Sequence, residues 1–217
     1  MDASTLKHAF LQISQIMAEN KDYLISLDQR NGDGDLGLSM ASGFSAASDY
    51  LCAADETDLG RLMMQASSVF NETAPSTLGT ILSFAMMGMA LSWRGKNEAS
   101  LAEAALAMQC GVDKIMEKTG AKPGEKTVLD ALCPGIDALA QNAGLEAIDA
   151  LKAAAGAARA GAESTMPLRA VHGRAAYYGE KSIGHIDGGA VAGSLIFAAL
   201  YALAAKKTER TDGSCGV

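Results

Sequence analysis

Cysteine, proline and aromatic residues are scarce in this chain, and it has no strongly basic stretch. Its 217 residues include 4 cysteines, 4 prolines and 5% aromatic residues. Cys52, Cys110, Cys133 and Cys215 lack C-x-x-C spacing, which excludes a zinc ribbon or a disulfide framework and predicts reduced thiols. The formal net charge of −7 disfavours contact with a phosphate backbone. We therefore expect no nucleic-acid partner.

A recognisable leader and a membrane-length apolar run are also lacking. The first ten residues, MDASTLKHAF, have neither a basic region nor a long apolar stretch. The longest apolar run, residues 190–205, has 16 residues, whereas a membrane span requires roughly 20. We expect a cytoplasmic protein without a membrane partner, in which residues 1–206 form one domain and residues 207–217 a flexible tail.

The composition that remains favours helices. Hydrophobic residues make up 49% of the chain, and Ala, Leu and Met dominate the periodic segments, whereas the residues that strands prefer are few. Apolar residues recur at three- and four-residue steps, and Thr57 or Asp58, and Ser76 or Thr77, stand where helix caps belong. The pattern predicts an all-α, antiparallel up-and-down bundle of eight helices, at about residues 4–20, 38–53, 58–69, 77–93, 99–118, 130–139, 145–162 and 190–205. The last helix is apolar all round, which predicts an internal position.

Two long segments, residues 23–37 and 165–189, show no helical period. Both carry charged residues and repeated glycines. Long irregular connections in compact domains are usually functional. We therefore expect the chemistry of this protein to reside in these two segments.

The first irregular segment contains three aspartates, Asp28, Asp33 and Asp35, within eight residues and with glycines between them. Glycine permits tight or left-handed backbone, so the loop could bring the carboxylates close together. At that distance they would repel one another strongly unless a cation lay between them. Oxygen ligands suit Mg²⁺ or Ca²⁺, and Mg²⁺ is commonly held by one or two carboxylates together with substrate phosphates. The sequence predicts a divalent metal site here.

Other interpretations of this loop are tested by spacing. Gly32-x-Gly34-x-x-Gly37 formally matches a dinucleotide fingerprint, but no strand precedes it and two aspartates would face the pyrophosphate. An EF-hand fails because its sixth residue would be Leu36 and its twelfth Ser42. A solvated acidic turn that caps the following helix stays open as the alternative.

Four motifs in order resemble the L subunit of dihydroxyacetone kinase, which is also the carboxy-terminal domain of single-chain dihydroxyacetone kinases. That family shows an Asp and, a few residues later, Gly-Asp-x-Asp-His-Gly, and the three aspartates stand in its acidic places. The other motifs are Leu78-Gly79-Thr80, Gly124-Glu125-Lys126-Thr127-Val128-Leu129-Asp130-Ala131-Leu132, and residues 173–187, with Gly173-Arg174-Ala175 at their start and Gly184-His185-Ile186-Asp187 at their end. With the surrounding helices, the resemblance extends over nearly the whole chain.

The resemblance implies an eight-helix barrel that binds Mg-ADP or Mg-ATP at one end. Asp28, Asp33 and Asp35 would hold a pair of Mg²⁺ ions that bridge to the phosphates. The remaining nucleotide-binding positions would be Ser76, Thr77, Gly79 and Thr80 near the phosphates, Thr127 and Val128 near the adenine, and Arg174 and Asp187. A helix N-terminus at Ser76 and Thr77 is a ready anion site, and Arg174 would face the phosphates or the transferred group as the catalytic residue.

The implied activity is phosphoryl transfer to a small ketose such as dihydroxyacetone. In the family, a separate K subunit holds the ketose through a covalent histidine link, so the site would close across a protein–protein interface. The donor would be free ATP, or a bound ADP recharged by a phosphocarrier protein of the phosphotransferase system; the sequence leaves both open. An ADP-loaded regulatory module without turnover is the second interpretation, and a fatty-acid kinase component is the third.

The chain departs from the family pattern at a few positions. Leu36 stands where the family has His, Pro75 stands in a turn that many members build from Ser and Gly, and His185-Ile186-Asp187-Gly188 replaces His-Gln-Asp-Pro. We expect nucleotide and metal binding to be retained, whereas the acceptor sugar stays undetermined. Lys126 and Lys181 are expected to be solvated. The eleven methionines are expected to fill the core, with a lipid-binding cavity as the alternative.

Overall fold

The computed structural model describes residues 1–30 and 32–212, with side chains as far as residue 207. The described residues form nine α-helices and one 3-10 helix: α1 Ala3–Glu19, α2 Lys21–Asp28, α3 Leu36–Ala53, α4 Leu59–Thr73, α5 Thr77–Ser92, α6 Leu101–Thr119, α7 Leu129–Gln141, α8 Ala147–Glu163, η1 Arg174–Ser182 and α9 Gly188–Asp212. Within this part of the chain the only β-type pairing is an isolated bridge between Asp2 and Glu98. The all-α prediction is confirmed, but the predicted count of eight helices is wrong, because there are ten.

The two additional helices lie in the segments that the sequence analysis left irregular. α2 has only 8 residues, and its buried residues, Leu24 and Leu27, are too few to establish a period. η1 is interrupted at Gly179, where φ is +56° and ψ is −124°. Short helices of this kind depend on tertiary contacts for their stability, so local patterns do not reveal them.

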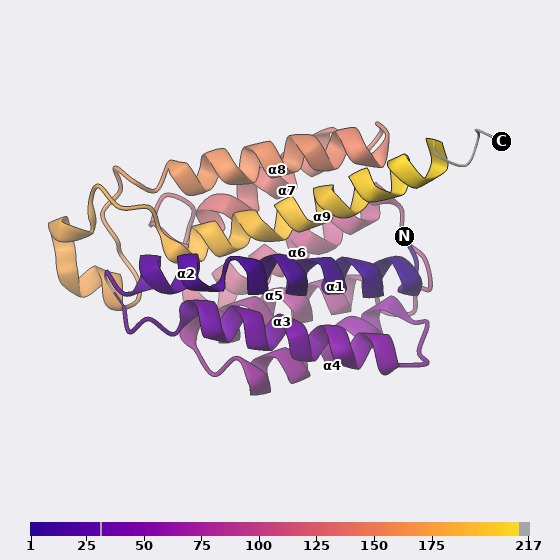
Figure 1. Ribbon diagram of the computed structural model, residues 1–217, viewed down its shortest axis with the longest axis horizontal. Coiled ribbons are helices and arrows are strands. Elements are labelled where there is room, and N and C mark those ends of the chain that lie inside the picture. The colour runs from indigo at the N-terminus through magenta and orange to yellow at the C-terminus, as the bar shows by residue number, and fades with distance from the viewer. Residues whose placement is uncertain (31, 213–217) are drawn as a thin grey trace.

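Eight of the helices close into an antiparallel barrel. α1 packs against α3, each of the helices α3 to α8 packs against the next one in the chain, and α9 returns to α1. Figure 1 shows them side by side along the long axis of the molecule, with α2, the loop after it and η1 at the left-hand end. Among the predicted caps, Asp58 accepts a hydrogen bond from the Arg61 N–H, and Ser76 accepts one from the Gly79 N–H.

The apolar last helix occupies the wall of the barrel rather than its interior. α9 packs against α1, α7 and α8, and its side chains are mostly half-buried. In the described part of the chain it contains the one stretch, Gly188–Lys207, that is long and apolar enough to cross a membrane by length and composition. The prediction of an internal helix is wrong, because an eight-membered ring needs this helix as a wall element. α9 also continues to Asp212, past the predicted end of the domain at residue 206, and residues 213–217, including Cys215, lie outside the described residues.

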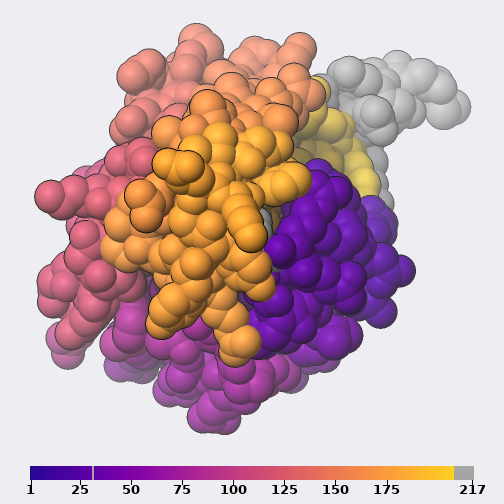
Figure 2. All heavy atoms as spheres, turned by 90° about the vertical axis from the view of Figure 1, so that its left-hand side faces the viewer, coloured from indigo at the N-terminus to yellow at the C-terminus, as the bar shows by residue number. Residues whose placement is uncertain are grey.

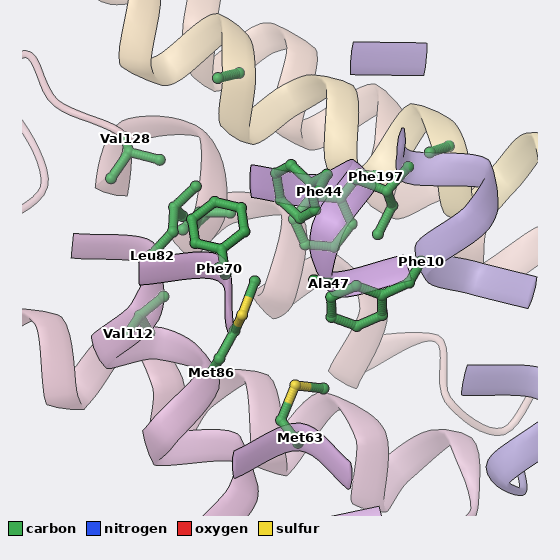
Figure 3. Packing of buried hydrophobic residues seen from close by; sticks show 14 of the residues in the cluster. Phe10, Phe44, Ala47, Met63, Phe70, Leu82, Met86, Val112, Val128 and Phe197 are labelled. Carbon is green, nitrogen blue, oxygen red and sulfur yellow. The ribbon is translucent and has the colours of Figure 1, made fainter. Parts of the chain in front are cut away.

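Aromatic and methionine side chains fill the barrel (Figure 3). The rings of Phe44 and Phe70 meet edge to face, with centroids 4.8 Å apart and planes at 65°. Met63 and Met86 are buried beside them, and both also line an apolar cavity. This cavity of about 580 Å³ lies between the helices. Its occupancy by a lipid stays a prediction.

Candidate functional site

The acidic loop joins the end of α2 to the start of α3. Asp28 is the last residue of α2, and its Oδ2 accepts hydrogen bonds from the backbone N–H groups of Gly34, at 2.8 Å, and Leu36, at 3.4 Å. Gly34 has a φ of +78°, a left-handed conformation that favours glycine. The loop thus folds back on Asp28, and one oxygen from each of Asp28, Asp33 and Asp35 lies within 4.8 Å of the others.

The charge of this cluster is only partly balanced. Burial raises the pKa of the Asp35 carboxyl, the neighbouring charges of Asp33 and Asp28 raise it further, and Arg174 opposes them. The Nη2 atom of Arg174 lies 2.7 Å from Oδ2 of Asp33. Three carboxylate oxygens within 4.8 Å of one another form a donor set suited to a hard divalent cation. The residues present therefore fit the predicted Mg²⁺ site.

Leu36, which stands where the family has His, is buried. A Cβ at Gly188, the first residue of α9, would collide with the Leu36 side chain and lie near Leu27. Leu36 is therefore part of the contact between the acidic loop and the start of α9. An apolar residue at this position joins the loop to the barrel by packing.

The start of α5 forms a second part of this end of the barrel. The Ser76 hydroxyl accepts a hydrogen bond from the Gly79 N–H at 3.1 Å, while Thr77 and Thr80 are exposed. Gly79 has no room for a side chain, since a Cβ there would overlap the carbonyl oxygen of Ala74. The first N–H groups of a helix have no intrahelical acceptor, so this turn offers donors to an anion.

The loop before α7 is organised by one buried carboxylate. Asp130 accepts hydrogen bonds from the Gly124 N–H at 2.5 Å and from the Thr127 N–H at 2.6 Å. Val128 is buried, and a Cβ at Gly189 would lie 3.6 Å from its nitrogen and 3.9 Å from Cδ1 of Leu78. The motifs of α5, α7 and α9 therefore converge around Gly189.

Asp187 caps the start of α9. Its Oδ2 accepts a hydrogen bond from the Ala190 N–H at 2.7 Å, and its own N–H donates to the Thr165 hydroxyl at 2.9 Å. Burial raises the pKa of its carboxyl to about 6, although the Ala190 hydrogen bond and the Lys126 charge act in the opposite direction. The contacts of Asp187 within the protein hold the segment that follows η1.

Lys126 was expected to be solvated, and this prediction is wrong. Its side chain is buried, and Nζ donates to the backbone carbonyls of Thr165, Leu168 and His185. Lys126 is also the one residue other than glycine with a left-handed backbone among the described residues, with a φ of 62°. Neither property follows from local sequence, because the three carbonyls belong to a segment 39 to 59 residues away.

Two aromatic residues at this end of the barrel, Tyr177 and Tyr178, were not among the predicted site residues. A shallow cavity of about 460 Å³ is lined by Gly32, Arg174, Tyr177 and Tyr178. A signal was present, since two adjacent tyrosines in a glycine-rich, non-periodic segment are unusual in a chain with 5 tyrosines. Figure 2 looks onto this end, where the orange segment that includes η1 lies across the middle of the face, beside the purple N-terminal part.

The structure thus sorts the predicted site residues into two groups at one end of the barrel. One group is the acidic trio, joined to Arg174 by the contact with Asp33. The other lies around Gly189 and comprises Ser76, Thr77, Gly79, Thr80, Thr127, Val128 and Asp187, on the starts of α5, α7 and α9. Packing of Leu36 against Gly188 connects the two groups.

Comparisons with known proteins agree with this arrangement. Residues 31–202 match the family model described as the DAK2 domain. The ADP-binding subunit DhaL of the PEP-dependent dihydroxyacetone kinase of Escherichia coli K12 is 32% identical over 194 residues, which cover 88% of this chain and 92% of the relative. The L-erythrulose 1-kinase of Mycolicibacterium smegmatis is also 32% identical, over 86% of this chain but only 33% of its own length.

A solved structure also resembles this one. The crystal structure of the dihydroxyacetone kinase from C. freundii, in complex with AMP-PNP and Mg²⁺, aligns with a TM-score of 0.71 at 23% sequence identity. The match covers 90% of this chain and 33% of that one. At this level of identity the likeness establishes the helical fold.

Proposed function

This chain belongs to the DAK2 domain family, and we propose from that premise that it is the nucleotide-binding subunit of a ketose kinase. In this proposal it holds Mg-ADP or Mg-ATP at the end of the barrel where α2, α5, α7 and η1 meet. A phosphoryl group passes from that nucleotide to a small ketose, such as dihydroxyacetone, on a K-type partner subunit. The observation that carries the proposal is the cluster of three carboxylates within 4.8 Å, with Arg174 beside it.

The acidic trio is the proposed metal site. Asp28, Asp33 and Asp35 would hold one or two Mg²⁺ ions, which when bound neutralise phosphate charge and orient the transferred group. Asp28 also accepts two backbone hydrogen bonds, so it fixes the loop as well as contributing an oxygen. The Asp33 carboxylate contacts Arg174 instead, and a bound cation would share this carboxylate with the arginine.

The other predicted positions would bind the nucleotide itself. The N–H groups and hydroxyls at the start of α5 suit a phosphate, and Thr127 and Val128 are the residues proposed near the adenine. Arg174 supplies a planar, permanently charged donor to the phosphates or the transferred group. Phosphoryl transfer depends chiefly on positioning and charge neutralisation, so this chain needs no side-chain nucleophile.

The relatives support a particular donor and partner. The Escherichia coli relative and one from Listeria innocua are named as ADP-binding subunits of PEP-dependent kinases, and the one from Lactococcus lactis is named as PTS-dependent. These names favour a bound ADP that a phosphocarrier protein recharges. They also favour a separate subunit that holds the ketose.

Calorimetry with Mg-ADP tests the proposal. We expect the wild-type chain to bind Mg-ADP and Asp33→Asn to bind at least tenfold more weakly, since even outer-shell partners of a metal contribute roughly 10–100-fold to affinity. Asp22→Asn, which removes an exposed carboxylate from α2, should match the wild type. Helicity by circular dichroism should be the same in all three. Unchanged affinity in Asp33→Asn would count decisively against the metal site.

Turnover is tested separately from binding. With a cognate K-type subunit and a phosphoryl donor, the kinase proposal requires that labelled phosphate reach the ketose. Binding of Mg-ADP without transfer to any ketose would instead favour the ADP-loaded regulatory module.

A further inference from the structure

The segment that carries Arg174, residues 164–187, has little hydrophobic attachment to the barrel. Its large apolar side chains are mainly exposed, namely Met166, Val171, Tyr177, Tyr178 and Ile183, while Ile186, next to α9, packs against the core. Its buried residues are only Thr165, Ala170 and Ser182. Apolar burial is the usual reason why a surface segment keeps one position. Polar contacts must therefore position this one.

One buried ammonium makes the central contacts. Nζ of Lys126 lies 2.9 Å from the Thr165 carbonyl oxygen and 3.2 Å from that of Leu168, and it also donates to the carbonyl of His185. An ammonium has three N–H donors, and all three are used here. The acceptors lie before and after η1, so a single side chain holds both ends of the segment.

We infer that Lys126 is a positioning residue of the proposed nucleotide site, which fixes the Arg174 segment by binding three of its backbone carbonyls. The inference rests on the proposed function. Thr127 and Val128, proposed near the adenine, follow Lys126 directly in the chain. These two residues and Arg174, proposed near the phosphates, are therefore positioned relative to one buried nitrogen atom. Displacement of this atom would release the segment that carries Arg174 from the loop that carries Thr127 and Val128.

The surroundings explain why a lysine is suited to this position. A buried charge is tolerated only where polar groups replace its water. Three carbonyl oxygens do this directly, and the carboxylates of Asp187 and Asp130 contribute favourable charge nearby. Removal of the ammonium would leave the carbonyls of Leu168 and His185 without this donor, and two carboxylates without their neighbouring cation. The carbonyl of Thr165 would keep only the Leu168 N–H.

A second, more exposed contact joins the same loop and segment. The carbonyl of Glu125 accepts a hydrogen bond from the Val171 N–H at 3.4 Å, and its carboxylate lies 2.6 Å from Nε2 of His172. This pair is half-buried, so water competes for it. Of the two contacts, the one made by Lys126 is the buried one. It should therefore contribute more to holding the segment in place.

The experiment compares Lys126→Ala with the matched variant Lys122→Ala, which removes an exposed lysine from the same loop. Mg-ADP affinity is measured by calorimetry, and amide hydrogen exchange is followed along the whole chain. We expect Lys126→Ala to bind Mg-ADP at least tenfold more weakly. Exchange should accelerate in residues 164–187, while the barrel helices stay protected. Lys122→Ala should behave as the wild type in both measurements.

Chemical rescue distinguishes positioning from a general loss of structure. Propylammonium has the length of the missing side chain, so it should restore both affinity and protection to Lys126→Ala, whereas the neutral 1-propanol should not. If Lys126→Ala does not fold, Lys126→Gln, which keeps amide donors without the charge, is measured in the same way.

The possible results distinguish the inference on Lys126 from the proposed function. Wild-type affinity and unchanged exchange in the folded Lys126 variant overturn the inference and leave the proposed function intact. Accelerated exchange throughout the barrel, without rescue, also overturns it, because Lys126 would then be a stability residue. If the wild type itself fails to bind Mg-ADP, the proposed function is lost, and the exchange pattern alone decides whether Lys126 positions the segment.

Discussion

Replacement of Arg174 by glutamine should change metal affinity and nucleotide affinity in opposite directions. The Nη2 atom of Arg174 lies 2.7 Å from Oδ2 of Asp33, and this carboxylate is also proposed to bind Mg²⁺. Without nucleotide, the arginine competes with the metal for this carboxylate and repels it. With nucleotide, the same arginine is available to the phosphates. Arg174→Gln should therefore strengthen binding of Mg²⁺ alone and weaken binding of ADP at saturating Mg²⁺.

The exposure of the two side chains sets the magnitude of each effect. The Arg174 and Asp33 side chains are 67% and 40% exposed, and ion pairs of this kind contribute about 0.2–1 kcal/mol. With 1.4 kcal/mol for each factor of ten, Mg²⁺ affinity should rise by about 1.4- to 5-fold. A hydrogen bond to a charged phosphate contributes about 1.5–3 kcal/mol, so ADP affinity should fall by roughly 10- to 150-fold.

Calorimetric titrations with MgCl₂ alone, and with ADP at saturating Mg²⁺, measure both quantities. Arg169→Gln is the matched control, because it removes the same charge from an exposed position in the same segment. The difference between the two variants isolates the contact with Asp33 from the general change of charge. A decrease in Mg²⁺ affinity in Arg174→Gln, or an ADP affinity equal to that of Arg169→Gln, would refute the reasoning.

Three further predictions concern stability. Asp187→Asn keeps an acceptor at the α9 cap but removes a carboxyl whose pKa burial raises to about 6. In the wild type, the contribution of this carboxyl to the free energy of unfolding falls as pH rises from 3.8 to about 6. Over this range the unfolded chain has already lost the proton that the folded protein still holds. The variant should therefore be more stable than the wild type above pH 6, by on the order of 1–3 kcal/mol, with no gain below pH 4. Urea unfolding across this pH range measures the difference. A larger gain at pH 4 than above pH 6 would contradict the prediction. Gly79→Ala should lower the melting temperature, because the added methyl group would overlap the Ala74 carbonyl. Gly156→Ala, in open space on α8, should raise stability by about 0.5–1 kcal/mol. Equal shifts in melting temperature for the two variants would contradict the steric argument. Phe70→Ala should reduce the free energy of unfolding by about 3–5 kcal/mol in urea titrations, and a loss below about 1 kcal/mol would mean that the barrel core refills the space.

Local sequence patterns were sufficient for the elements of the barrel wall. Each of the eight predicted helices is present. An amphipathic period over ten or more residues, or for the last helix a continuous apolar run, is a local signal that requires only burial of the apolar residues. The grouping of Asp28, Asp33 and Asp35 was also accessible, since the three lie within eight residues and the contacts that close the loop on Asp28 are made within the loop itself. The DAK2 family membership rests on motifs of the same local kind.

The tertiary structure alone decided where the remaining elements lie and what they contact. Closure of the ring places α9 in the wall, although its composition matches an internal helix. The burial of Lys126 and the pairing of Arg174 with Asp33 join residues that are far apart in the chain, and each depends on the position that the closed barrel gives to both partners. A sequence window records the chemistry of a side chain and its neighbours along the backbone. The distance to a partner 39 or 141 residues away is a property of the assembled barrel.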